Sequence, residues 1–166
     1  MPLNGNERAM LNAFLDAQRE TLEWKCRGLN PEQLKEAASP PSNLTLLGLL
    51  RHLTEVEYFW LEGILLGKGS HLGFYSGEEN PAEGTRAWTE LGSHPAEEVL
   101  QNWKEACEAS RRNADSLPDL DAAGAYPWDY QPVTLRWIMT HMLREYARHT
   151  GHADLLRERI DGATGE

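Results

Sequence analysis

The chain has 166 residues, of which 40% are hydrophobic and 25% are charged, and its formal net charge is −10 at pH 7. This length and composition are typical of one globular domain spanning residues 1–166, and they exclude a disordered chain. The acidic balance, with no basic stripe, excludes a general nucleic-acid or anionic-membrane binder, because phosphate contacts need clustered lysine and arginine.

The first residues, Met1 to Leu11, are polar and mixed in charge, which is not the pattern of a secretory signal. No stretch reaches the roughly 20 apolar residues that a membrane span needs. The two cysteines, Cys26 and Cys107, have no close metal-binding spacing and fall at apolar-periodic positions. We therefore expect two small buried thiols in a reduced, cytoplasmic protein.

Four segments show the three- and four-residue spacing of apolar side chains that is typical of amphipathic helices. Ser42 or Asn43 is expected to cap the second of them, and Asp161-Gly162 to end the fourth. The predicted helices cover approximately residues 6–29, 44–66, 95–117 and 133–160, with a short helical turn at 31–37.

Helices of this length would each be roughly 30–40 Å long, and the compact solution for four of them is an all-α four-helix bundle. The connection between helices 2 and 3 is long, so a crossover is expected there rather than a tight turn. Both long loops carry aromatic residues that could wall an apolar acceptor pocket or seal the end of the bundle: Phe74 and Tyr75 in the first, which also carries His71 and Trp88, and Trp128 and Tyr130 in the second.

The fourth predicted helix has two ionisable residues in the middle of its apolar stripe. Glu145 and His149 follow Leu135, Ile138 and Met142 at helical steps, and apolar residues resume after them. An unpaired buried carboxylate costs several kcal/mol, so Glu145 should be paired or bound to a cation there. A Glu and a His four residues apart lie one turn apart and can share one metal ion.

A third ligand must come from another helix, and His52, on the flank of the second apolar stripe, is the best donor. Three alternatives remain open from the residues alone. His52 could be an ordinary core histidine, Glu145 could pair with Arg51, or the ligands could be His52, His149 and His152.

The run from Thr134 to Glu158, TLRWIMTHMLREYARHTGHADLLRE, resembles the last helix of the DinB-like superfamily, which includes the metal-binding domain of mycothiol-dependent maleylpyruvate isomerase. The run LLRHLTEVE, beginning at Leu49, is similar to the histidine-bearing helix of that superfamily. The resemblance covers essentially the whole chain in helix order.

This resemblance implies a bundle that holds one divalent ion, zinc or nickel, through His52, Glu145 and His149. Many members have His where this chain has Glu145, and the Glu form is similar to the mycothiol isomerase branch. Many members also have Gln where this chain has His152, so the resemblance leaves its role open among fourth ligand, proton shuttle and orienter of His149.

The function that the resemblance implies is a metal-dependent S-transferase, which joins a small thiol of the mycothiol or bacillithiol type to an electrophilic acceptor. His152 or His141 could move protons, since both imidazoles lie near the predicted ligands. Two rival hypotheses use the same residues: a hydrolase that activates water on the metal, and a non-enzymatic module that binds metal for stability or forms a homodimer.

Overall fold

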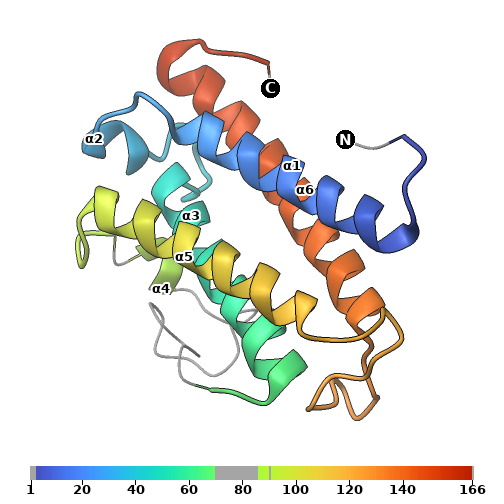
Figure 1. Ribbon diagram of the computed structural model, residues 1–166. Helices are drawn as coiled ribbons and strands as arrows, with labels where there is room; N and C mark the ends of the chain where they lie inside the picture. The colour runs from blue at the N-terminus through green and yellow to red at the C-terminus, as the bar shows by residue number, and fades with distance from the viewer. Residues whose placement is uncertain (1–2, 70–85, 90, 166) are drawn as a thin grey trace.

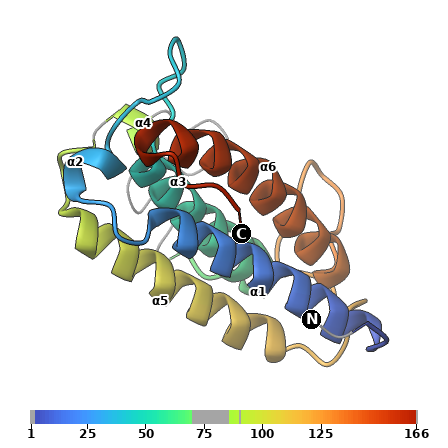
Figure 2. The ribbon, with the colours of Figure 1, turned by 90° about the horizontal axis from the view of Figure 1, so that it is seen from above.

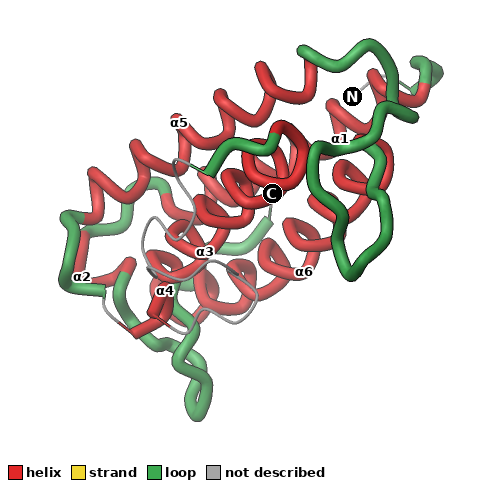
Figure 3. The backbone as a smooth tube through the Cα atoms, turned by 90° about the horizontal axis from the view of Figure 1, so that it is seen from below, coloured by secondary structure: helices red, strands yellow, loops and turns green. Residues whose placement is uncertain are grey.

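The computed structural model describes residues 3–69, 86–89 and 91–165, and in these residues every regular element is a helix (Figures 1 and 3). The predicted all-α fold is therefore confirmed. None of the described helices is both long and apolar enough to cross a membrane. The elements are α1 (Glu7–Cys26), α2 (Pro31–Leu34), α3 (Leu46–Tyr58), its π-helical continuation η1 (Phe59–Ile64), α4 (Arg86–Thr89), α5 (Ala96–Asp115) and α6 (Leu135–Asp161).

Threonines cap the two helices that carry the candidate site. Thr45 Oγ1 accepts a hydrogen bond from the backbone N–H of Gly48 at 2.9 Å, so α3 begins directly after it. The predicted caps, Ser42 and Asn43, were therefore wrong: the Ser42 hydroxyl accepts a bond within the preceding turn instead. Thr134 caps α6 in the same way, which starts that helix two residues later than the apolar pattern predicted.

The four long helices pack side by side, and two pairs of neighbours run parallel (Figures 1 and 2). Arg136 at the start of α6 pairs with Glu7 at the start of α1, at 2.8 Å. Arg157 near the end of α6 donates to the carbonyl of Lys25 near the end of α1, at 2.9 Å. Helices α3 and α5 also run parallel (Figure 1). The predicted crossover between them falls largely on residues 70–85, which lie outside the described residues.

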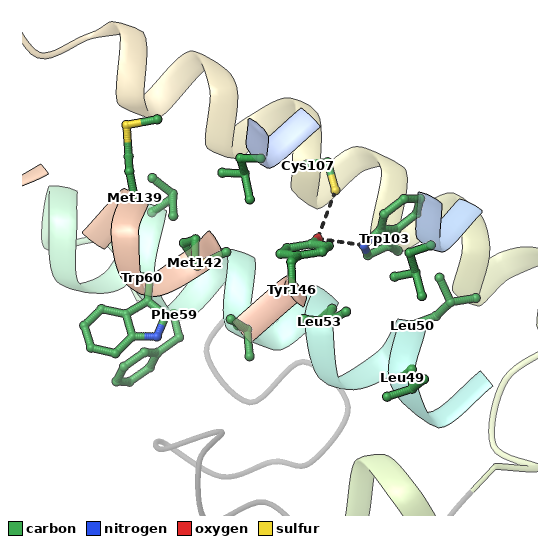
Figure 4. Packing of buried hydrophobic residues seen from close by; sticks show 14 of the residues in the cluster. Leu49, Leu50, Leu53, Phe59, Trp60, Trp103, Cys107, Met139, Met142 and Tyr146 are labelled. Atoms are coloured by element: carbon green, nitrogen blue, oxygen red, sulfur yellow. Dashed lines mark hydrogen bonds between the residues drawn. The ribbon is translucent and has the colours of Figure 1, made fainter. Parts of the chain in front are cut away.

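Helix α3 is the central element, because all of its residues are buried. Its five leucines and Leu22 of α1 are fully enclosed, and the aromatic and sulfur-containing side chains of α5 and α6 pack around them (Figure 4). Each such apolar side chain contributes roughly 1.5–3 kcal/mol by leaving water. A helix with no exposed face must satisfy its polar residues inside the protein, and His52 and Glu57 are both on it.

The loop between α5 and α6 is attached to the end of η1. The backbone N–H groups of Ala125 and Tyr126 donate to the carbonyls of Leu65 and Ile64 at 3.0 and 3.1 Å. A Cβ at Gly124 would lie 2.9 Å from the Ile64 carbonyl oxygen, so only glycine allows this close approach. The attachment fixes the position of the loop relative to the C-terminal end of the central helix.

A two-residue turn at the tip of this loop directs its aromatic residues. Trp128 and Gln131 exchange backbone hydrogen bonds of 2.9 Å, with Asp129 and Tyr130 at φ values of 48° and 60°. The Trp128 ring consequently packs against Phe59, with ring centroids 5.5 Å apart, whereas Tyr130 is 94% exposed. The expectation that Tyr130 would wall a pocket with Trp128 was therefore wrong.

Candidate metal centre

The antiparallel packing of α3 and α6 brings His52, Glu145 and His149 together. One ligand atom from each of the three residues lies within 4.8 Å of the others. His149 Nε2 is 3.7 Å from Glu145 Oε2, and the imidazole rings of His149 and His52 have centroids 4.8 Å apart. Two nitrogen donors and one carboxylate at this spacing are a suitable donor set for a divalent transition metal.

These three side chains open into a cavity of about 390 Å³. It runs along α6 from His149, beside Trp88 of α4, to His141, beside Trp60 of η1 and Trp128 of the second loop. The described residues that line it are His52, Val56, Phe59, Trp60, Trp88, Trp128, His141, Arg144, Glu145, Arg148 and His149. The candidate ligands are therefore accessible to a small molecule from one side.

His52 supports the metal interpretation, because its imidazole is only 8% exposed and its Nδ1 atom has no hydrogen-bond partner among the described residues. Burial, and then the neighbouring His149, lower the pKa of His52 to about 3. The ring is therefore neutral at pH 7 and keeps a lone pair for a ligand. A buried imidazole nitrogen without a partner costs free energy, which a bound cation would recover.

Glu145 is ready to act as an anionic ligand. The neighbouring His149 imidazole and then the Arg144 guanidinium lower its pKa to about 2, although partial burial acts in the opposite direction. Its ion pair is with Arg144 at 3.1 Å, so the alternative pairing with Arg51 is wrong. The carboxylate is consequently charged at neutral pH and within reach of both histidines.

His152 and His141 occupy different places around these three residues. His152 Nδ1 lies 3.3 Å from His149 Nδ1, and His152 is not part of the cavity lining. His141 does line the cavity, with its Nε2 3.9 Å from Glu145 Oε1 and its ring 4.4 Å from that of Trp60. In the described residues His52 and His149 therefore group with Glu145 and not with His152.

A second polar cluster lies behind the site, inside the bundle, and the sequence analysis did not identify it. Arg19 of α1 donates two hydrogen bonds of 2.8 Å to the fully buried carboxylate of Glu57. Tyr146 donates to the same carboxylate at 2.7 Å and accepts from Trp103 Nε1 at 3.0 Å (Figure 4). Because Tyr146 follows Glu145 directly, this cluster fixes the rotation of α6 at the candidate metal centre.

Both cysteines are free and buried, as predicted. Burial raises the pKa of Cys26 to about 12, and burial followed by the Glu57 carboxylate raises the pKa of Cys107 even further. Neither thiol lines the cavity. Phe74 and Tyr75, which were expected near the acceptor, lie outside the described residues, as does His71.

The family comparison agrees with this arrangement. The model of the mycothiol S-transferase family matches residues 10–162, which include all three candidate ligands and both histidines beside them. Searches of the curated proteins and of the solved structures gave no match. The matched family lies within the DinB/YfiT-like metal-binding superfamily whose helices the sequence resembles. Because the match covers nearly the whole chain, the protein belongs to the mycothiol S-transferase family.

Proposed function

We propose that this chain is a metal-dependent S-transferase, which joins a low-molecular-weight thiol of the mycothiol or bacillithiol type to an electrophilic acceptor. The observation that carries the proposal is a three-donor set, His52, Glu145 and His149, at the edge of a cavity large enough for a small substrate. A divalent ion of the zinc or nickel type, when bound to these side chains, would lower the pKa of a thiol that binds beside it.

The attacking sulfur must come from a second substrate, because the cysteines of the chain are unsuitable. A thiolate is the reactive form, and burial raises the pKa of both Cys26 and Cys107 far above neutral pH. Both also lie outside the lining of the cavity. A covalent intermediate on this chain is therefore not part of the proposal.

His141 is the residue we assign to accept the proton that the thiol loses. It lines the cavity beside Glu145, and burial followed by the nearby Arg144 lowers its pKa, which keeps the ring neutral at pH 7. The S–H bond breaks, the new S–C bond forms on the acceptor, and the leaving group departs with its bonding electrons.

His152 has a positioning role in the proposal. Its Nδ1 faces His149 Nδ1 at 3.3 Å, and burial followed by His149 lowers its pKa. A neutral His152 can accept a hydrogen bond from that nitrogen, which leaves His149 Nε2 directed toward Glu145. Such a partner on the far nitrogen is the usual way in which proteins orient a metal-binding imidazole.

The test is a conjugation assay on the purified, metal-loaded protein with monochlorobimane and a panel of thiols that includes mycothiol and bacillithiol. We expect thiol-dependent conjugation that disappears after chelation and returns when zinc or nickel is added. Cys26→Ser and Cys107→Ser, which serve as matched controls, should keep this activity wherever they fold.

Two results would contradict the proposal. A metal-free protein that conjugates as fast as the loaded one would exclude metal activation of the thiol. Hydrolysis of esters or amides by the loaded protein, without any thiol conjugation, would favour water as the nucleophile instead.

A further inference from the structure

Two arginines border the cavity on α6, one helical turn apart, and among the described residues only Arg144 has a partner. Arg144 donates to Glu145 Oε1 at 3.1 Å and lies 3.3 Å from His141 Nδ1. Arg148 lines the same cavity, yet it makes no hydrogen bond or ion pair with any residue that the structure describes. Its guanidinium is therefore available to a ligand.

The charge of the cavity differs in sign from that of the whole chain. With histidines neutral, the charged residues in the described part of its lining are Arg144, Arg148 and Glu145, which gives a formal charge of +1. The chain as a whole carries −10. A positive opening on a strongly acidic protein attracts small anions toward the cavity and repels them from the rest of the surface. A divalent cation bound to the three ligands would strengthen that preference.

The rest of the wall is largely aromatic. Phe59, Trp60 and Trp128 pack edge to face with centroids 5.1 to 5.5 Å apart, and Trp88 lies at the other end of the cavity. Such a wall suits a flat apolar body, for which ring faces and edges provide contact area without polar groups to satisfy. The cavity thus combines apolar walls with one available guanidinium.

We propose, building on the function proposed above, that the acceptor is an aromatic or similarly flat electrophile that carries a carboxylate, and that Arg148 is the residue that selects it. A guanidinium can donate two parallel hydrogen bonds to one carboxylate, which makes arginine selective for that group. Arg144 cannot serve in the same way without leaving Glu145 and His141. Arg148 is thus a specificity residue, separate from the groups that hold the metal.

The first experiment measures binding without any thiol, so no reaction takes place. Tryptophan fluorescence of the metal-loaded protein is titrated with 4-methyl-3-nitrobenzoate and, separately, with its neutral methyl ester. We expect the carboxylate to bind about five- to tenfold more tightly than the ester at low salt, and the difference to shrink as salt is added. Arg148→Met should remove the difference while leaving ester binding unchanged.

Two further variants make the result specific. Arg148→Lys keeps the charge but not the paired donors, so it should retain part of the preference. Arg112→Met removes an arginine that is 70% exposed on α5, away from the cavity, and it should behave as the wild type. Metal content and circular dichroism are measured on each variant, so that a loss of fold is not counted as a loss of selectivity.

The proposal is overturned if the wild type shows no preference for the carboxylate, or if the preference survives in Arg148→Met. The second result would place the carboxylate elsewhere, for example on the metal itself.

A second assay compares 4-chloro-3-nitrobenzoate with its methyl ester as acceptors, using a thiol that has no carboxylate. We expect Arg148→Met to raise KM for the carboxylate with little change in kcat. Selective binding without conjugation would contradict the proposed S-transferase function but support the role of Arg148. Conjugation without selectivity would support the S-transferase function but contradict the role of Arg148.

Discussion

Two polar clusters share helix α6, and they differ in whether their hydrogen-bonding groups have partners in the described residues. In the buried cluster, the Glu57 carboxylate receives bonds from Arg19 and Tyr146, and the Tyr146 hydroxyl in turn accepts one from Trp103. In the cavity cluster, His52 Nδ1 has no partner among the described residues although it is buried. The first arrangement is complete without a ligand, whereas the second leaves a donor set open. Neighbouring residues of one helix, Glu145 and Tyr146, thus belong to sites with different purposes.

The largest expected effect is on metal binding by the cavity cluster. His149→Ala should abolish stoichiometric metal binding, because the change removes a ligand from either candidate triad while the fold survives on the buried cluster. Elemental analysis of the purified variant measures this. His94→Ala is the matched control, since His94 lies at the start of α5 and bonds to Glu98. A full equivalent of tightly bound metal in His149→Ala would exclude the site as described.

The next largest effect concerns the buried cluster. Glu57→Gln removes the buried counter-charge of Arg19 and should lower the free energy of unfolding by about 3 kcal/mol. This is the low end of the usual range, because Asp16 also bonds to Arg19, at 2.9 Å. Urea denaturation provides the measurement. The double variant Arg19→Met, Glu57→Met should be more stable than Glu57→Gln, since it leaves no charge unpaired.

A surface pair gives the matched control for that prediction. Lys104 and Glu23 lie 2.7 Å apart but are 42% and 35% exposed, so Glu23→Gln should cost less than about 1 kcal/mol. If Glu57→Gln lowered the free energy of unfolding no more than Glu23→Gln, the buried cluster would not contribute the stability assigned to it. Folded Glu57→Gln should still bind one equivalent of metal, which separates the two clusters.

A smaller effect on metal affinity is expected at His152, which contacts the cavity cluster through His149 without lining the cavity. His152→Ala should weaken metal affinity by about 10- to 100-fold through loss of the hydrogen bond to His149, but saturation should still reach one equivalent. Competition with a chromogenic chelator measures this. Loss of the metal in His152→Ala, with unchanged affinity in Glu145→Gln, would instead support the triad of His52, His149 and His152.

The smallest expected effect is the loss of folding stability on acidification. Burial alone would raise the pKa of Glu57, but Arg19 and its hydrogen bonds lower it below the ordinary value of 4.5. The stability that this carboxylate contributes is therefore fully present above pH 4.5 and is lost as the pH falls below that value. Urea midpoints of metal-free protein between pH 7 and 3 should fall less in the Arg19→Met, Glu57→Met variant. Equal slopes would contradict the assignment.

Much of the fold was accessible from the sequence, because apolar periodicity directly reports which helix face is buried. The stripe of α6 predicted that Glu145 and His149 share one inward face, and the position of His52 beside Leu49 and Val56 predicted its direction. The structure places these three side chains together.

Other features depend on contacts that a periodic pattern does not encode. Helix α3 is buried on every side, so its pattern cannot separate Glu57, which pairs with Arg19, from His52, which faces the cavity. The cap at Thr45 and the inward direction of Trp128 depend on individual hydrogen bonds and turn angles. Arg148 looked like any exposed helix residue until the cavity was known.

The π-helical segment η1 lets the central helix hold an extra residue without losing register. A π-turn holds about one residue more than an α-turn, so one residue can be gained or lost between Phe59 and Ile64 while the turns on either side keep their rotation relative to each other. His52 lies before this segment, and Trp60 lies within it. A gain or loss of one residue here would therefore change which side chains form the aromatic end of the cavity, while the metal ligands stay in register with α6. Substrate range and metal binding would then evolve at separate positions of a single helix.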